Sequence, residues 1–195
     1  MNKLDQLKNK ARTLGVAEVC EGLLDDDRFP LWSGSSKSFQ HHYGLGGLLQ
    51  HTYEVVELCF TVSGMYPQHD IDPTELFLAA LFHDAGKMYD YEPVNYCPAN
   101  PLETKYKEWS STSHKRKIHH ISRSGIIWTE NARKVPAVYD KYYEDVLHAI
   151  LAHHTCREAG SPVAPKSRVA WVVTLCDNLS ARMCDADTFD VLQRK

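Results

Sequence analysis

Histidine and aspartate side chains in this chain gather at the ends of apolar segments, where ionisable groups are costly. The clearest case is the run LFLAALFHDAGK, residues 76–87, in which His83 and Asp84 follow seven apolar residues. Burying an imidazole beside a carboxylate is unfavourable unless the two are paired or bind a metal ion. This stretch therefore raises the question of a buried metal centre.

Helical spacing places a second histidine on a buried face. In residues 47–63, His51 shares a stripe with the apolar residues Leu48 and Val55. The polar residues of the same segment, among them Glu54, fall on the opposite stripe. His51 is therefore predicted to point into the core.

Two later segments show the same feature. An apolar stripe in residues 138–154 that includes Ile150 runs directly into His153 and His154, and Asp177 follows a largely apolar run of eight residues. Any one of these residues alone would more often be a core histidine bonded to a carbonyl, or an aspartate paired locally. At least four imidazoles and two carboxylates facing inward together indicate a shared metal centre. Imidazole with carboxylate suits a divalent transition metal better than calcium.

Nearly all the periodic segments that must position these residues are helical, which predicts an all-α fold. We predict helices at about residues 4–14, in a short segment through 24, and at 47–63, 73–84, 115–131, 138–154 and 166–184. Asp72 as N-cap and Pro73 at the first helical position mark one start, and Gly86 is expected to be a left-handed C-cap. Residues 88–114 are predicted to form a long ordered loop.

Composition limits the function classes. The chain of 195 residues is 43% hydrophobic and 24% charged, with a formal charge of −3 and no apolar run long enough for a membrane span. A soluble globular protein is expected, without a membrane partner and without the basic field that nucleic-acid binders often carry. The six cysteines lack CxxC spacing and the N-terminus lacks an apolar signal core, which favours reduced thiols in the cytoplasm.

The order of the motifs resembles the HD superfamily of metal-dependent phosphohydrolases. The motifs are LLQHT with His51, LFHDAGK with His83 and Asp84, HHIS, LAHHT with His153 and His154, and LCDNLSARM with Asp177. The resemblance spans residues 41–184 and implies an HD-type helical bundle. We expect a single HD-type domain over residues 1–195, with residues 1–40 as an N-terminal helical and loop extension.

Two longer stretches, HHYGLGGLLQHTYEVVELC and HHTCREAGSPVAPKSRVAWVVTLCDNLSARM, resemble the HD domains of bacterial 3′-to-5′ exoribonucleases. The first is also similar to HD-type relaxases of mobile elements. Those exoribonucleases carry an OB-fold ahead of the HD domain, and this chain leaves no room for one. That difference places a polymeric substrate in doubt.

The resemblance also implies a set of metal ligands. It assigns one ion to His51, His83, Asp84 and Asp177, and a second ion to Asp84, His120, His153 and His154. Helical spacing does not decide between His119 and His120, and the wording of the family motif favours His120. Some relatives place a third-metal carboxylate one turn before the first histidine, where this chain has Gly47.

The implied chemistry is hydrolysis of a phosphoester by a metal-activated water. One or two divalent ions (Mn, Fe, Ni, Co, Zn or Mg) would supply it, with Asp84 as the catalytic bridge between them. Lys87 is a candidate catalytic and substrate-phosphate contact, and Arg182 a second phosphate contact. The alternatives are a solvated lysine behind a helix cap and an ordinary surface arginine.

The most basic segment, KYKEWSSTSHKRK, lies in the predicted loop and is a candidate rim for phosphates. Its aromatic residues Tyr106 and Trp109 could stack a base or anchor the loop.

Three functions follow from these observations. The first is a phosphohydrolase, either a phosphomonoesterase or a phosphodiesterase, acting on nucleotides or short oligonucleotides. The second is a 3′-to-5′ exonuclease on RNA or single-stranded DNA, and the third is a non-catalytic nucleotide-binding module. The complete ligand set weighs against the third, and the oligomeric state stays open.

Overall fold

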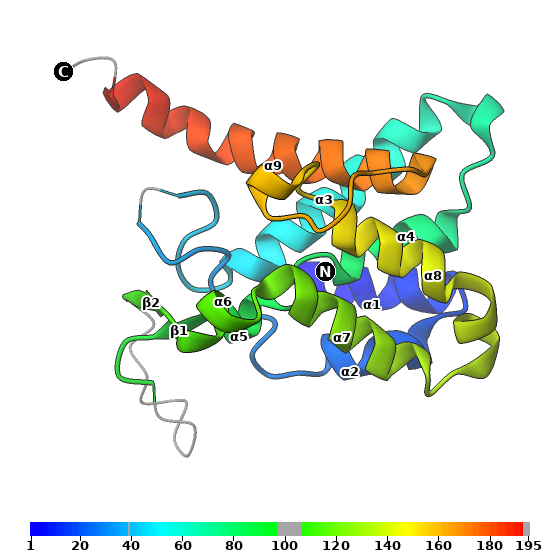
Figure 1. Cartoon of the computed structure of the whole chain (residues 1–195), viewed down its shortest axis with the longest axis horizontal. Helices are drawn as coiled ribbons and strands as arrows, with labels where there is room; N and C mark the ends of the chain where they lie inside the picture. Colours follow the sequence, from blue (N-terminus) through cyan, green and yellow to red (C-terminus); the bar gives the residue numbers. More distant parts are fainter. Residues whose placement is uncertain (39, 97–106, 193–195) are drawn as a thin grey trace.

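The computed structural model describes residues 1–38, 40–96 and 107–192, and they form an all-α fold (Figure 1). The helices are α1 (Lys3–Thr13), α2 (Ala17–Leu24), α3 (Gly47–Gly64), α4 (Pro73–Phe82), α5 (Lys87–Asp90), α6 (Ser113–Lys117), α7 (His120–Ala132), α8 (Pro136–Ala152) and α9 (Arg168–Leu192). Two short strands, β1 (Tyr91–Pro93) and β2 (Trp109–Ser111), form an antiparallel pair. The predicted fold class is confirmed.

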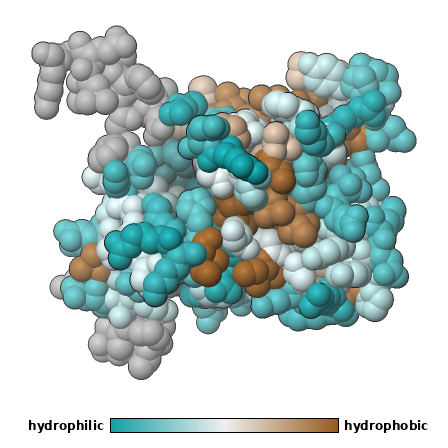
Figure 2. Space-filling view, viewed as in Figure 1, coloured by the Kyte–Doolittle hydropathy of each residue, from teal (hydrophilic) through white to brown (hydrophobic). Residues whose placement is uncertain are grey.

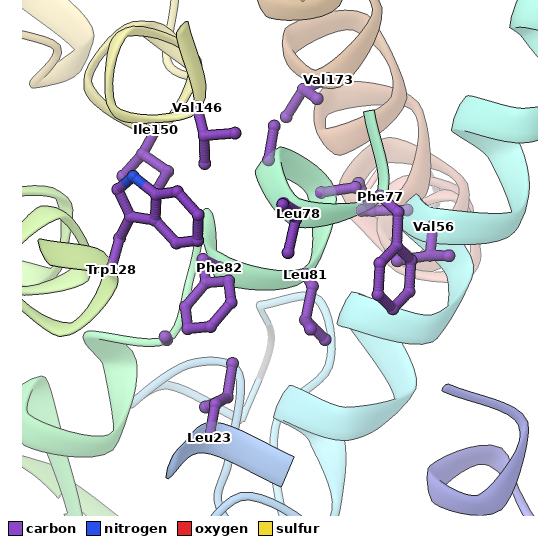
Figure 3. Close-up of a cluster of buried hydrophobic side chains, with 14 of the residues drawn as sticks. Leu23, Val56, Phe77, Leu78, Leu81, Phe82, Trp128, Val146, Ile150 and Val173 are labelled. Carbon is purple, nitrogen blue, oxygen red and sulfur yellow. The ribbon is translucent and has the colours of Figure 1, made fainter. Parts of the chain in front are cut away.

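Helix α4 is the centre of the bundle. All of its residues from 76 to 82 are buried, and it contacts α3, α7, α8 and α9. In the core cluster Phe77 lies next to Val56 of α3, while Phe82 faces Trp128 of α7 (Figure 3). Each large side chain buried in this way contributes about 1.5–3 kcal/mol, so this run fixes the helix that carries His83.

The predicted start of α4 is confirmed. The side chain of Asp72 accepts hydrogen bonds from the backbone N–H groups of Thr74 at 2.8 Å and Glu75 at 3.3 Å, and Pro73 occupies the first turn. An N-cap of this kind satisfies amide groups that have no partner within the helix. Among the described residues, no helix combines the length and the apolar character needed to cross a membrane.

Glu75, in the first turn of α4, gives the fold a predicted pH dependence. Burial, together with the like charges of Asp145 and Asp72, raises the pKa of Glu75 to about 7. The folded state therefore holds this proton more tightly than the unfolded chain, and stability is lost as the pH rises from about 4.5 to about 7. We expect Glu75→Gln to raise the free energy of unfolding by about 1 kcal/mol at pH 8, less than full linkage because the side chain is half exposed.

Thermal melts of Glu75→Gln at pH 5 and pH 8 check this prediction, with the exposed Glu144→Gln as the control. The increase in stability should be smaller at pH 5, where Glu75 is protonated. An equal increase in stability at pH 5 and pH 8 would show that the charge of Glu75 is not its cause.

The predicted loop over residues 88–114 is wrong in part, because it contains α5, the strand pair and the start of α6. The strands pair Tyr91 with Ser111 and Pro93 with Trp109. The indole of Trp32 donates to Tyr91 O at 2.7 Å and packs edge-on against Trp109, which is buried. Trp109 is therefore an anchor for this segment, whereas Lys105 and Tyr106 lie outside the described residues.

The single helix predicted over residues 115–131 is also wrong, because the chain breaks it into α6 and α7. His119, between the two helices, has a positive φ of 68°. Helix α7 begins at His120, whose backbone N–H donates to Asp90 Oδ2 at 3.0 Å. A carboxylate at a helix N-terminus is favourable, so Asp90 from α5 fixes where α7 begins.

Gly86 is not the left-handed C-cap that the sequence predicts. Its φ is −66°, and the chain continues directly into α5. A Cβ atom at this position would lie 2.2 Å from the carbonyl oxygen of His120. The glycine is needed because the backbone of α7 approaches it closely, and left-handed geometry is not the reason.

Candidate metal centre

Five helices bring the ionisable groups together at one end of α4. His51 lies near the start of α3, His83 caps α4, His120 opens α7, His153 caps α8 and Asp177 lies within α9. These five side chains and Asp84 are all buried. The inward orientation that helical spacing predicted is therefore present for His51, His83, Asp84, His153 and Asp177, whereas His154, also predicted to face inward, is only half-buried.

The first group of donors surrounds a space between α3, α4 and α9. His51 Nε2 lies 3.0 Å from Asp177 Oδ1, 3.2 Å from Asp84 Oδ2 and 3.3 Å from His83 Nε2. Two atoms bound to one ion by bonds of about 2.1 Å lie about 3 Å apart. The first group thus has the spacing that a shared cation requires.

The second group lies on the other side of Asp84. Ring nitrogens of His120, His153 and His154 fall within 4.8 Å of one another. The Nε2 atoms of His120 and His153 lie 3.6 and 3.7 Å from Asp84 Oδ1. Asp84 therefore directs Oδ2 to the first group and Oδ1 to the second. One carboxylate placed between two sets of imidazoles is suited to bridge two cations.

Three buried atoms of the second group lack hydrogen-bond partners. They are Oδ1 of Asp84 and Nε2 of both His120 and His153. A buried polar atom without a partner costs about 1–3 kcal/mol, and native structures contain few of them. A divalent cation among these atoms would satisfy all three, so the residues present fit a metal.

Backbone carbonyls hold two of the imidazoles in the tautomer that metal binding needs. His83 Nδ1 donates to Ala80 O, and His153 Nδ1 donates to Ile150 O, each at 2.7 Å. With Nδ1 protonated, the Nε2 atom of a neutral ring carries a lone pair. Both histidines follow the last residue of a helix, which gives them the same hydrogen bond.

Asp90 orients His120, a role that no pattern in the sequence indicated. Its Oδ2 accepts from His120 Nδ1 at 3.0 Å, while its Oδ1 accepts from His114 Nδ1 at 2.9 Å. Burial, partly offset by Asp90, lowers the pKa of His120 to about 3, so that its Nε2 remains an acceptor directed at Asp84. The ring of His119 instead lies against that of His120, tilted by 38° and with the ring centroids 4.1 Å apart. This arrangement supports His120 over His119 as the ligand.

Replacing Asp90 with asparagine is expected to weaken the second group selectively. The change removes the carboxylate that orients His120, and losses of this kind lower metal affinity about 10–100-fold. Titration of the metal-free protein with Mn²⁺ should show one weakened class of site and one class unchanged, with the exposed Asp70→Asn as the control. Equal weakening of both classes would contradict a selective role.

The position predicted for Glu54 from helical spacing is wrong. It was expected on the outer stripe of α3, but it is half-buried because the segment around His42 folds over it. His51 Nδ1 donates to Ser180 Oγ at 3.1 Å, and Ser180 Oγ donates to Glu54 Oε2 at 2.8 Å. The same oxygen accepts from His42 Nε2 at 2.9 Å. This chain of hydrogen bonds sets the orientation of His51.

Gly47 is required by the same close packing. A Cβ at this position, one turn before His51, would lie 1.9 Å from His42 O. A third-metal carboxylate therefore has no room there.

Lys87 is not the solvated lysine of the alternative interpretation. It is buried, and its Nζ lies 2.6 Å from Asp84 Oδ2. Burial opposes ionisation of Asp84, but Lys87 and the histidines around it hold its pKa well below the usual range. The centre therefore presents an ionised carboxylate to a cation.

Protons compete with a metal ion for the ring nitrogens of the histidines at this centre. Burial disfavours the charged forms of His51 and His153, but the neighbouring carboxylates of Asp177 and Asp84 outweigh it and raise both pKa values. Metal binding must displace any such proton, so affinity should fall in acid.

A cleft of about 350 Å³ opens over the centre. The residues at the centre that reach its wall include His120, His154 and Asp177. Three cationic side chains also line it: Lys87, Lys115 and Arg182. The sequence had identified Lys87 and Arg182 as candidate phosphate contacts, and the structure places both at this cleft.

Comparison with known proteins agrees with the motif order. The family model described as HD domain matches residues 48–182. No solved structure matches the chain.

Proposed function

This chain belongs to the HD domain family, and we propose that it is a divalent-metal-dependent phosphohydrolase acting on nucleotides or short oligonucleotides. Proteins of this family are generally hydrolases. The observation that carries the proposal is the position of Asp84, with one carboxylate oxygen toward each group of imidazoles.

The proposed ligands follow the two groups. His51, His83, Asp84 and Asp177 would hold one ion, and His120, His153 and His154 would hold a second ion together with Asp84. When bound, such ions supply a nucleophilic hydroxide near neutral pH and neutralise charge on the phosphoryl group. Asp84 would set the position of the two groups relative to each other, because its carboxylate lies between them.

The cationic residues of the cleft would bind the phosphate groups of the substrate. Lys87 is held against Asp84 and lines the cleft, so that it would place positive charge next to a phosphoryl oxygen. Lys115 and Arg182 line the same cleft. Three cations around one small cleft favour a compact anionic substrate, and this supports a nucleotide or a short oligonucleotide.

A substrate panel tests the proposal. The protein is first assayed for bound metal by elemental analysis after purification without chelators. It is then assayed with Mn²⁺ on nucleoside mono-, di- and triphosphates, cyclic dinucleotides, and short RNA and DNA.

We expect bound transition metal and hydrolysis of the small substrates. Stepwise shortening of RNA or DNA from the 3′ end, without hydrolysis of the small substrates, would identify an exonuclease instead. Metal binding without turnover of any phosphoester would indicate a non-catalytic module, and absence of metal would contradict the whole centre.

A further inference from the structure

The outer face of α9 carries a row of exposed apolar side chains. Trp171, Leu175, Leu179 and Met183 follow one another at intervals of four residues and are 48%, 58%, 44% and 68% exposed. Single exposed apolar residues are normal, but a contiguous row usually marks a contact surface. We call these four residues the α9 ridge.

The surroundings of the α9 ridge also differ from an ordinary surface. Between residues 168 and 183, the only carboxylate is Asp177, which is buried at the metal centre, and there is no lysine. The exposed polar neighbours of the ridge are Arg168, Asn178 and Arg182. Depletion of lysine and acidic residues, with enrichment of tryptophan, methionine and arginine, is typical of protein interfaces.

The position of α9 leaves the ridge accessible. The helix runs along one edge of the molecule, and its C-terminal turns extend past the other helices (Figure 1). Hydrophobic surface is visible along this upper edge in the space-filling view (Figure 2). The later turns of α9 are therefore open to a second helix, while its first turn lies beside the segment after α3, where Arg168 Nη1 donates to His69 O at 2.9 Å (Figure 1).

We propose that the α9 ridge is the interface of a homodimer, in which the α9 helices of two copies pack against each other about a two-fold axis. The order of the ridge favours a second copy over another partner. Its two leucines are central, and Trp171 and Met183 lie four residues outside them. An antiparallel pair places Leu175 against the partner's Leu179 and Trp171 against the partner's Met183, so every residue meets an apolar one.

The spacing also specifies how the helices cross. Side chains four residues apart form ridges inclined to the helix axis, and two such ridges interdigitate at about −50°. The four side chains expose on the order of 100 Å² each, so that pairing would bury about 800 Å² in total, and the flanking polar residues would add to it. An interface of this size is below that of stable complexes and predicts a weak, reversible dimer.

The dimer would form beside the cleft. Asn178 and Arg182 line the cleft and alternate along α9 with Leu179 and Met183 of the ridge. The second copy would therefore border the cleft mouth and restrict the approach of long polymers.

Sedimentation velocity and light scattering on the full chain test the dimer over about 1–200 μM. The mass should rise from the 22.2 kDa of one chain toward twice that value. The double variant Leu175→Glu/Leu179→Glu should remain at the mass of one chain over the whole range. Both residues are exposed, so the variant should fold, and its circular dichroism and metal content should match the parent protein.

The control is Ile126→Glu, which changes an exposed apolar residue on α7, away from α9. It should dimerise as the parent chain does. A parent chain that stays monomeric at the highest concentration would overturn the proposal. So would a double variant that still dimerises, which would place the interface elsewhere. Neither result depends on catalysis, so the experiment can contradict the proposed dimer without contradicting the proposed function.

Discussion

Replacing Asp84 with asparagine is expected to reduce phosphoester hydrolysis by about 1,000-fold or more and to lower the bound metal content. The amide keeps the shape of the carboxylate but loses its charge, and its NH₂ group faces one of the two imidazole groups. Since Asp84 is the residue between both groups, each would lose a ligand at the same time. No other single change at the centre affects both groups in this way.

The substitution has a cost in stability that must be separated from its effect on activity. Lys87 Nζ is 2.6 Å from Asp84 Oδ2 and is buried, so asparagine leaves an ammonium without its counter-charge. A buried charge that loses its partner is strongly destabilising. The double variant Asp84→Asn/Lys87→Met removes that charge as well. It should recover thermal stability without recovering activity.

Activity with saturating Mn²⁺, metal content and thermal melting are measured on both variants and on the parent protein. A folded Asp84→Asn protein with full activity would contradict the bridging role. Activity that returns in the double variant would show that the loss came from unfolding.

Gly86→Ala is expected to destabilise the protein by about 3 kcal/mol and to weaken metal binding at the second group. The added Cβ would lie 2.2 Å from His120 O and 2.8 Å from His120 Cα. Both are backbone atoms, so α7 must shift as a whole. His120 opens α7, and its Nε2 would move away from Asp84 with the helix.

Gly64→Ala is the matched control for this change. Gly64 lies at the end of α3, with a right-handed backbone and nothing within 4 Å of an added Cβ. The same substitution there should leave stability unchanged or raise it by about 0.5 kcal/mol. Urea unfolding and Mn²⁺ titration of both variants check the prediction. If Gly86→Ala melts with the parent protein, α5 and α7 are less tightly packed than the structure indicates.

Sequence periodicity predicted the all-α fold and the inward positions of His51, His83 and Asp84. These features are local, because an apolar helix that ends in ionisable residues indicates by itself which of its residues are buried. The HD family was predicted from motif order and is confirmed by the family match over residues 48–182. The narrower resemblance to the exoribonucleases stays a prediction, as do the roles of individual ligands.

Other features depend on contacts between segments far apart in the chain, and no local pattern predicts them. Asp90 orients His120 across 30 residues, and Glu54 reaches His51 through Ser180, 126 residues away. Gly86 has an ordinary backbone conformation, and only the approach of α7 explains why it is a glycine.

The opening stretch LFLAALFHDAGK shows this division in one segment. Its sequence alone determined that residues 76–82 are core and that His83 and Asp84 enter the interior, because apolar burial dictates both. Only the tertiary structure decided that Asp84 lies between two groups of histidines and that Lys87 turns back to pair with it. Those outcomes depend on where four other helices lie relative to α4, and this is fixed by the packing of the whole bundle.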